Sequence, residues 1–524
     1  MSFDTTFFSI PTEVAQYLLT FCHPCDVVAF SRTCRTAHAL VHNSTDQYLW
    51  RTLFLTYPFD DLRKSLDAPP DSSAIDWRTQ LKRRVHAEVV TSKRVEGTLD
   101  EMAEVYNVLS DAIAASAPII PGGWNRPSSN LAWVRRKLDC CRRPDPLLEE
   151  ASPFARLSSF LMPIILTLSP GDDILFSITS RRAARTFVYD LRNYTEERLW
   201  GPYQKGGRAV NWLHLRADII VITMNLREFG RHWPKAFQPP LLVRGLEATR
   251  AYSAPEMSRR SERDWAGVEG HWMRVVCFCD YRDLIRFNSN GWNPDLFDDN
   301  YEEASRLLRL SLHVICVESD PAVLATLPDP RRPPITFGGT MRGFNSDEVL
   351  DRAVKGTVSV MPDGNIRWSF VSAALETYVS VYENHDQWSS EGVQIGNVCS
   401  AAGVVGAWSG ALHEHASLRI ILQAIRQARI FFFSQLSSHC FRDGISNGSF
   451  RFAYRPVLVI QDCRGKGQRT ILRSRHIGQF LLNELEGIVG ICVFEQDIMS
   501  FSSSSLLWYY WLPYTVLYIS GIIG

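Results

Sequence analysis

Residues 10–22 read Ile-Pro-Thr-Glu-Val-Ala-Gln-Tyr-Leu-Leu-Thr-Phe-Cys, and they decide how the N-terminal part of the chain folds. Pro11 suits the first turn of a helix, where its missing N–H would have no partner anyway. Glu13 in the same turn is favoured by the positive end of the helix dipole. Apolar side chains then recur at helical spacing, at Val14, Tyr17, Leu18, Phe21 and Cys22. We therefore predict a helix with one apolar face.

A second helix is expected after the break at His23-Pro24, beginning at Asp26 and carrying Val27 on its apolar face. Another helical pattern surrounds Trp50. Roughly forty-five residues of short helices bury too little surface to be stable alone. We expect one face to be left over for a partner helix. The alternative is a generic helical hairpin at the start of a larger domain.

The order of these residues resembles the F-box, a helical module that joins a substrate receptor to an SCF-type ubiquitin ligase. The family pattern is Leu/Ile-Pro-x-Glu-Leu/Val, an aliphatic pair, a helix opening with Asp-Leu, then Cys-Arg/Lys and a Trp. The resemblance implies that residues 5–57 bind the Skp adaptor, and through it the cullin core of the ligase. The implied contact residues are Ile10, Pro11, Glu13, Val14, Leu18, Leu19, Cys22, Asp26, Val27, Cys34, Arg35 and Trp50. Departures from the pattern are Ile10 and Val27 for Leu, and Cys22 where Leu is common.

The composition points to a globular protein rather than to a nucleic-acid-binding or secreted one. The chain has 524 residues, with 56 positive and 56 negative side chains. This balance gives no electrostatic argument for nucleic acid or an anionic membrane surface. Twelve cysteines are scattered thinly, and the first residues lack a signal-peptide pattern. We expect a reducing cytoplasmic or nuclear setting with free thiols.

Residues 58–262 are expected to form a linker and a mainly helical region. The linker is rich in Pro, Asp and Ser between residues 58 and 76. Helical periodicity predicts helices over residues 77–92, 100–116, 129–143, 153–168 and 210–229. Residues 185–189 (Arg-Thr-Phe-Val-Tyr) look instead like a strand.

Residues 263–415 are predicted to be β-rich and to recognise the substrate. Strands are expected over residues 335–343, 354–360, 366–371, 388–396 and 403–412, with a hairpin turn at 362–365. Gly270-His271-Trp272 resembles the entry strand of calycin-type barrels, where the Trp closes the barrel floor. The fold class is therefore α+β, with N-terminal helices followed by an antiparallel barrel- or sandwich-like domain. Trp272, Trp368 and Trp388 are candidates for substrate contacts, although core packing is the more common role of such residues.

Three phrases in this region also resemble F-box proteins of filamentous, basidiomycete-type fungi. They are residues 267–272 (Gly-Val-Glu-Gly-His-Trp), 280–284 (Asp-Tyr-Arg-Asp-Leu) and 388–394 (Trp-Ser-Ser-Glu-Gly-Val-Gln). With gaps, the resemblance covers about residues 5–415. It does not indicate which substrate is bound.

Residues 416–524 lose the strand pattern, so this region is expected to be divergent and closure of a barrel is left open. The tail 505–524 is apolar and long enough to cross a ~30 Å hydrocarbon core. A membrane tail anchor is one interpretation. Pro513, the many Tyr and Trp residues and the lack of a basic flank argue against it. Translation past the true end of the coding region is the preferred alternative.

No catalytic, metal or cofactor site is predicted. Cys22 and Cys25 have the spacing of a redox pair, but they lie between two helices with no strand before them. His413 and His415 would need a third ligand to hold a metal. Cys277 and Cys279 share one face of a strand and are expected to fill a sheet.

Three functions follow from these features. The preferred one is a non-catalytic substrate receptor, with the F-box on the Skp adaptor and the β-rich region on an unknown protein target. The second is a small-ligand-binding β-barrel that uses the F-box for assembly outside a ligase. The third is a helical scaffold whose N-terminus only imitates an F-box.

Overall fold

The computed structural model divides the chain into two compact units. Residues 1–228, 239–344 and 348–437 belong to the first, and the remaining residues belong to the second. The structure describes residues 10–43, 46–65, 67–69, 71–92, 97–119, 127–140, 151–161, 178–228, 245–250, 263–298, 301–343, 352–374, 387–396, 398–400, 402–410, 429–436, 457–461, 469–473, 489–493, 501–502 and 516–520.

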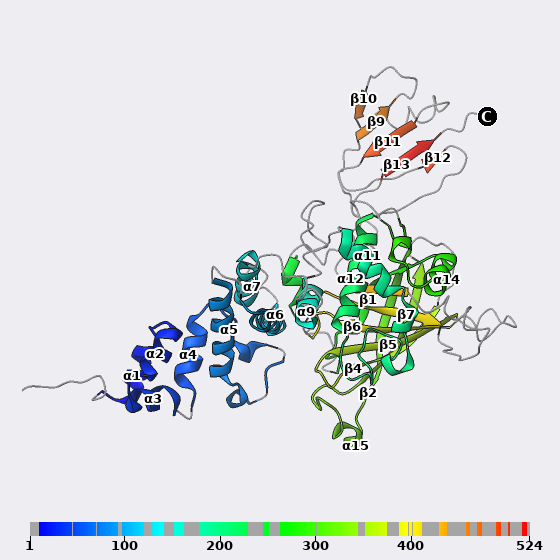
Figure 1. Cartoon of the computed structure of the whole chain (residues 1–524). Helices are drawn as coiled ribbons and strands as arrows, with labels where there is room; N and C mark the ends of the chain where they lie inside the picture. The colour runs from blue at the N-terminus through cyan, green and yellow to red at the C-terminus, as the bar shows by residue number, and fades with distance from the viewer. Residues whose placement is uncertain are drawn as a thin grey trace, which may run out of the picture. The chain divides into compact units, whose positions relative to one another are not determined.

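The first unit begins with a group of short helices, which Figure 1 shows in dark blue. They are α1 (Thr12–Leu19), α2 (Pro24–Ser31), α3 (Arg35–His42) and α4 (Tyr48–Thr56). Their shared core contains Val27, Val41, Leu49, Leu53 and Phe54, each at most 1% exposed. The helical pattern of this segment is therefore confirmed. The second helix starts at Pro24 rather than Asp26, because the His23 ring accepts a hydrogen bond from the Cys25 N–H and caps it there.

A series of longer helices continues the first unit. They are α5 (Trp77–Ser92), α6 (Leu99–Ala114), α7 (Ser129–Cys140), α9 (Ser152–Phe160), α11 (Ile178–Val188) and α12 (Trp212–Glu228). Short 3-10 helices accompany them: η2 (Leu62–Lys64), η3 (Ser72–Ala74), η4 (Leu191–Asn193), η5 (Glu196–Arg198) and η6 (Gly245–Thr249). The predicted helices over residues 77–92 and 100–116 are confirmed, as are those over 129–143, 153–168 and 210–229 in the parts of these ranges that the structure describes.

The predicted strand at residues 185–189 is wrong, because residues 185–188 form the end of α11 and Tyr189 follows it. Their aromatic and β-branched side chains favour a strand locally. In the folded chain Arg185 instead faces Glu303 in a fully buried ion pair, and α11 packs along α12. Tertiary contacts thus override the local preference.

The β-rich part of the first unit is a closed antiparallel barrel in which each strand pairs with the next. Its strands are β1 (Gly270–Phe278), β2 (Ala304–Val317), β3 (Ile335–Gly343), β4 (Arg352–Val360), β5 (Ile366–Ala374), β6 (Trp388–Gln394), β7 (Val404–Gly410) and β8 (Arg429–Leu436). Connections carry α14 (Tyr281–Ser289), η7 (Pro294–Leu296) and α15 (Pro321–Leu324). The α+β class and the antiparallel sheet are confirmed.

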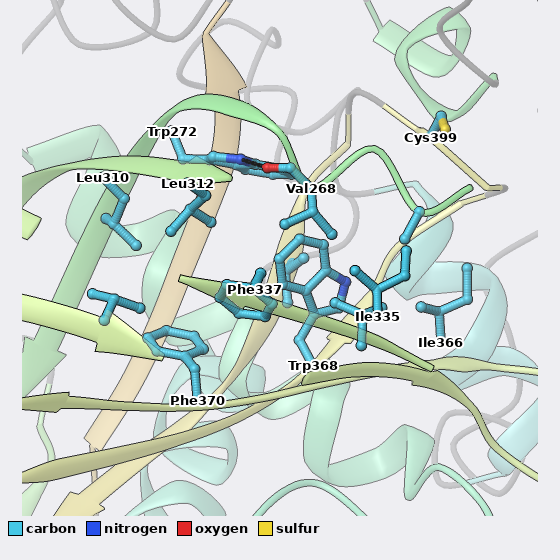
Figure 2. Close-up of a cluster of buried hydrophobic side chains, with 14 of the residues drawn as sticks. Val268, Trp272, Leu310, Leu312, Ile335, Phe337, Ile366, Trp368, Phe370 and Cys399 are labelled. Atoms are coloured by element: carbon cyan, nitrogen blue, oxygen red, sulfur yellow. Dashed lines mark hydrogen bonds between the residues drawn. The ribbon is translucent and has the colours of Figure 1, made fainter. Parts of the chain in front are cut away.

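One end of the barrel is filled by aromatic side chains (Figure 2). The rings of Trp272 and Trp368 lie 5.4 Å apart, and Phe337 lies 5.4 Å from Trp368. Both indole N–H groups are used, since Trp272 donates to the Val268 carbonyl and Trp368 to Gln394 Oε1. Trp272 therefore closes this end of the barrel, as the Gly-x-Trp pattern predicts.

The structure closes the barrel with a strand beyond residue 415, where the sequence pattern had left closure open. β8 pairs with both β7 and β1 and closes the barrel. Residues 430–433 are an unbroken apolar run without period-2 alternation, so sequence periodicity does not reveal the strand. α12 contacts β1, β7 and β8, so this stretch of sheet is covered by a helix on its outer side. A strand covered on both sides carries apolar residues continuously.

The second unit contains a separate sheet in the order β10-β9-β11-β13-β12. Its strands are β9 (Val457–Gln461), β10 (Arg469–Arg473), β11 (Val489–Val493), β12 (Phe501–Ser502) and β13 (Val516–Ser520). β13 belongs to the apolar tail and pairs with β11. The rest of that tail, residues 505–515 and 521–524, lies outside the described residues. Within the described residues, the longest apolar helices still fall short of what a bilayer crossing requires.

Candidate partner-binding surface

The outer face of α1 is an exposed apolar stripe. Val14, Tyr17, Leu18 and Phe21 are 46%, 51%, 46% and 73% exposed. They follow one another at helical spacing, and the rings of Tyr17 and Phe21 meet edge to face at 5.1 Å. Four neighbouring exposed apolar side chains on one helix are unusual for a surface that faces only water. We call these four residues the α1 face.

The opposite side of α1 holds the helix on the rest of the N-terminal group. Ala15 and Leu19 are buried there, and the Gln16 side-chain N–H donates to the Leu40 carbonyl at 3.0 Å. The helix is thus apolar on two sides, one used internally and the other left open. This matches the expectation of a face left over for a partner helix.

Trp50, Cys34 and His42 make their contacts within the N-terminal group of helices. The Trp50 indole donates to the Val41 carbonyl at 3.1 Å and stacks on His42 with ring centroids 5.9 Å apart. Cys34 caps α3, because its Sγ accepts from the Ala37 N–H at 3.4 Å. Burial, with the nearby Arg78 charge, lowers the pKa of His42 and so favours its neutral ring. These contacts fix the position of α1 rather than offering a surface.

The residues expected to contact the Skp adaptor therefore divide into two groups. Exposed ones are Pro11, Glu13, Val14, Leu18, Cys22, Asp26, Cys34 and Arg35, and Ile10 is half-buried. Leu19, Val27 and Trp50 are buried, with Val27 at 0% exposure. Val27 was expected on the contact face, but its complete burial makes it a packing residue in this structure. Tyr17 and Phe21 are exposed beside Val14 and Leu18 and were not among the expected contacts, although their helical spacing had placed them on the same face.

The tryptophans expected to contact a substrate are mainly core residues. Trp272 and Trp368 are at most 2% exposed. Trp388 is half-buried, and its ring lies 4.8 Å from that of Trp408. Of the three, only Trp388 has a surface that an outside molecule can reach without opening the barrel.

The cysteine and histidine clusters do not form a site within the described part of the chain. No group of three His, Cys, Asp or Glu side chains there could hold a metal ion. Cys22 and Cys25 are exposed free thiols. Burial raises the pKa of the Cys279 thiol to about 12, and the thiol accepts a 2.6 Å hydrogen bond from Tyr301. Residues 413–415 lie outside the described residues.

Comparison with known proteins identifies one part of the chain. Residues 7–46 match the family model of the F-box domain. The match covers α1, α2 and α3 and ends before α4, which carries Trp50. No curated protein and no solved structure matches the chain. The α1 face is therefore the exposed apolar surface of an F-box-like segment.

Proposed function

We propose that this protein is the substrate-receptor subunit of an SCF-type ubiquitin ligase, which binds the Skp adaptor through the α1 face. The proposal rests on one observation: an F-box match whose first helix exposes four apolar side chains outward. The adaptor supplies the helix that covers this face. Pro11, Glu13, Cys22, Asp26, Cys34 and Arg35 are also exposed, and we propose that Glu13, Asp26 and Arg35 supply the polar rim that a specific interface usually has. We also propose that the chain is related to the F-box proteins of filamentous fungi.

The barrel is proposed to hold the target protein, and the helical region to act as a spacer. Support comes from continuous packing along the first unit, in which α4 contacts α5, α5 contacts α6, α6 contacts α9 and α9 contacts α12. Asp60, just after α4, accepts hydrogen bonds from Ala117, Ser128 and Ser129. Asp67 pairs with Arg332 of the β2–β3 connection. A receptor acts by proximity, and a packed spacer serves that role better than a free linker because it limits the positions of the target lysine.

The test is co-purification with the Skp adaptor of Val14→Asp and Leu18→Asp variants. Losing the burial of a half-exposed leucine side chain in an interface weakens the binding free energy by about 1 kcal/mol. Desolvating the new carboxylate adds several kcal/mol, and this second effect dominates. Adaptor recovery should fall more than tenfold in both variants.

Matched controls exist on the same chain. Val89 and Leu99 are 45% and 46% exposed, and they lie on α5 and α6 rather than on α1. Val89→Asp and Leu99→Asp should co-purify like the wild type. Undiminished adaptor recovery with both α1 variants, at wild-type melting temperature, would contradict the proposal. Equal loss in all four variants would show a general effect of added charge and would also contradict it.

A further inference from the structure

An exposed tryptophan stacks on an arginine where the β1–β2 connection meets the helical region. Trp292 follows α14 and is 37% exposed, and the Arg192 guanidinium lies 3.6 Å from the centre of its ring. The Arg192 side chain is itself 61% exposed. We call these two residues the Arg192–Trp292 stack. Trp and Arg are over-represented among the residues that anchor protein interfaces, so the stack is a candidate contact for another protein.

Hydrogen bonds on both sides hold the stack in place. Asp190 accepts from the Arg192 backbone N–H, and its two carboxyl oxygens accept from Nε and Nη2, at 2.7 to 3.1 Å. Asn288 of α14 joins the two segments, because its Oδ1 accepts from the Leu191 N–H and its Nδ2 donates to the Tyr189 carbonyl. The stack is thus positioned before a partner arrives, which lowers the entropic cost of binding.

The backbone of Trp292 has a conformation that residues with a side chain rarely adopt. Its φ is 57°, in the left-handed region that favours glycine. More than a third of the side chain remains exposed, so the fold gains only part of the burial that a tryptophan can give. Conformations of this kind persist where neighbouring contacts hold them, and they cluster at binding sites.

The stack offers free hydrogen-bond donors, whereas its carboxylate is already used. Both oxygens of Asp190 accept from Arg192, but Arg192 Nη1 and the Trp292 indole N–H have no partner among the described residues. Asp295, three residues after Trp292, is paired with Arg182 at 3.3 Å. Guanidinium and indole groups only donate, so the complementary group is an ionised carboxylate, which only accepts. An apolar side chain next to that carboxylate would cover the exposed ring.

We propose that the Arg192–Trp292 stack captures the degradation target, by binding a segment that carries an Asp or Glu side chain beside an apolar one. This inference rests on the proposed function, because it names the place and the chemistry of target recognition. Exposed charge pairs contribute little and are screened by salt. The contact is therefore expected to be weak by itself and to weaken further as the salt concentration rises.

The test is fluorescence anisotropy of two labelled peptides with the purified full chain. The acidic peptide is Gly-Glu-Leu-Glu-Leu-Gly, and its neutral counterpart has Gln in place of Glu. Both ends are blocked, so that the side chains carry the only carboxylates. The acidic peptide should bind at least about fivefold more tightly, and the difference should shrink at high salt. Equal binding of both peptides, or no binding of the acidic one, would overturn the proposal.

The titration needs no ligase component, so the two proposals fail separately. If the acidic peptide does not bind while the adaptor still does, only the stack is refuted. If the adaptor does not bind, the peptide result still stands as a test of the stack.

Variants separate the stack from a general effect of charge. Arg192→Met removes the donors and keeps an apolar chain against the ring, so the acidic peptide should bind only as well as the neutral one. Trp292→Gly removes the ring at a φ that suits glycine, and binding of the acidic peptide should fall at least about fivefold. Unchanged binding in both folded variants would refute the assignment.

Arg63→Met is the matched control. Arg63 makes the same bidentate contact with an aspartate two residues earlier, Asp61, and has no stacked ring among the described residues. This variant should bind the acidic peptide like the wild type. A loss as large as that in Arg192→Met would show that any exposed arginine contributes, and would contradict the proposal.

Discussion

Replacing Asp218 by asparagine should stabilise the protein, and increasingly so as the pH rises. Asp218 lies on α12 and is fully buried, and neither carboxyl oxygen has a hydrogen-bond partner among the described residues. Its nearest titratable neighbour is His214, one turn earlier, with Nε2 3.7 Å from Oδ1. The His214 Nε2 also lies 3.1 Å from the Tyr194 hydroxyl. Burial raises the pKa of Asp218 well above its usual value and so favours the protonated carboxyl in the folded protein.

The sign and size of the effect follow from proton counting. A carboxyl with a raised pKa contributes stability below its unfolded pKa of about 3.9, and loses it as the pH rises toward the folded pKa. Each pH unit in that window costs about 1.4 kcal/mol. Burial, with the Arg198 charge, lowers the pKa of His214 to about 3, so the His214 contribution increases with pH up to about 6.5 and opposes that of Asp218. In the wild type the contributions of Asp218 and His214 to the pH dependence of stability therefore oppose each other below pH 6.5.

The Asp218→Asn variant removes one of the two opposing contributions. Its free energy of unfolding, minus that of the wild type, should increase with pH between pH 5 and 7, by at most about 1.4 kcal/mol per pH unit. The assay is denaturant unfolding of both proteins at pH 5, 6 and 7, followed by tryptophan fluorescence. A difference that stays constant across these pH values would refute the argument that Asp218 is protonated in the folded protein.

Two further predictions concern larger parts of the chain. Deletion of residues 263–436, which form the barrel including β8, should leave Skp binding intact, because α1–α4 pack on one another and on α5. Affinity purification with the proteasome inhibited should show that the deleted protein no longer captures degradation targets. Target capture by residues 1–262 alone would place recognition in the helices instead. Residues Val516–Ser520 form a strand paired with β11, so we expect no membrane-spanning helix there. Carbonate washing should therefore release the full chain from membranes as completely as it releases a chain lacking residues 498–524. Carbonate-resistant association that depends on those residues would establish a tail anchor.

The helices and most barrel strands could be predicted because their signals are local. Helical periodicity placed α5 and α6 within two residues, and the Pro362-Asp363-Gly364-Asn365 turn marked the β4–β5 hairpin, where Gly364 takes a φ of 82°. β2 was not predicted at all. It lies between Asp- and Glu-rich connections, and Arg306 and Arg309 interrupt its apolar pattern at irregular positions.

The candidate surface was predicted only in part, because periodicity does not say which apolar face of a helix is covered. Val14, Leu18 and Val27 have the same chemical character in the sequence. Only the packing of α2 on α3 places Val27 inside, while α1 leaves Val14 and Leu18 outside.

The most direct test of the central claim is calorimetry of the purified full chain with the purified Skp adaptor at several temperatures. If the α1 face is the contact surface, binding should show a negative heat-capacity change, because apolar area is buried. In a Tyr17→Ala/Phe21→Ala double variant the affinity should fall at least tenfold and the heat-capacity change should shrink. A complex that forms with the same affinity and the same heat-capacity change in the double variant would contradict the claim that this face binds the adaptor.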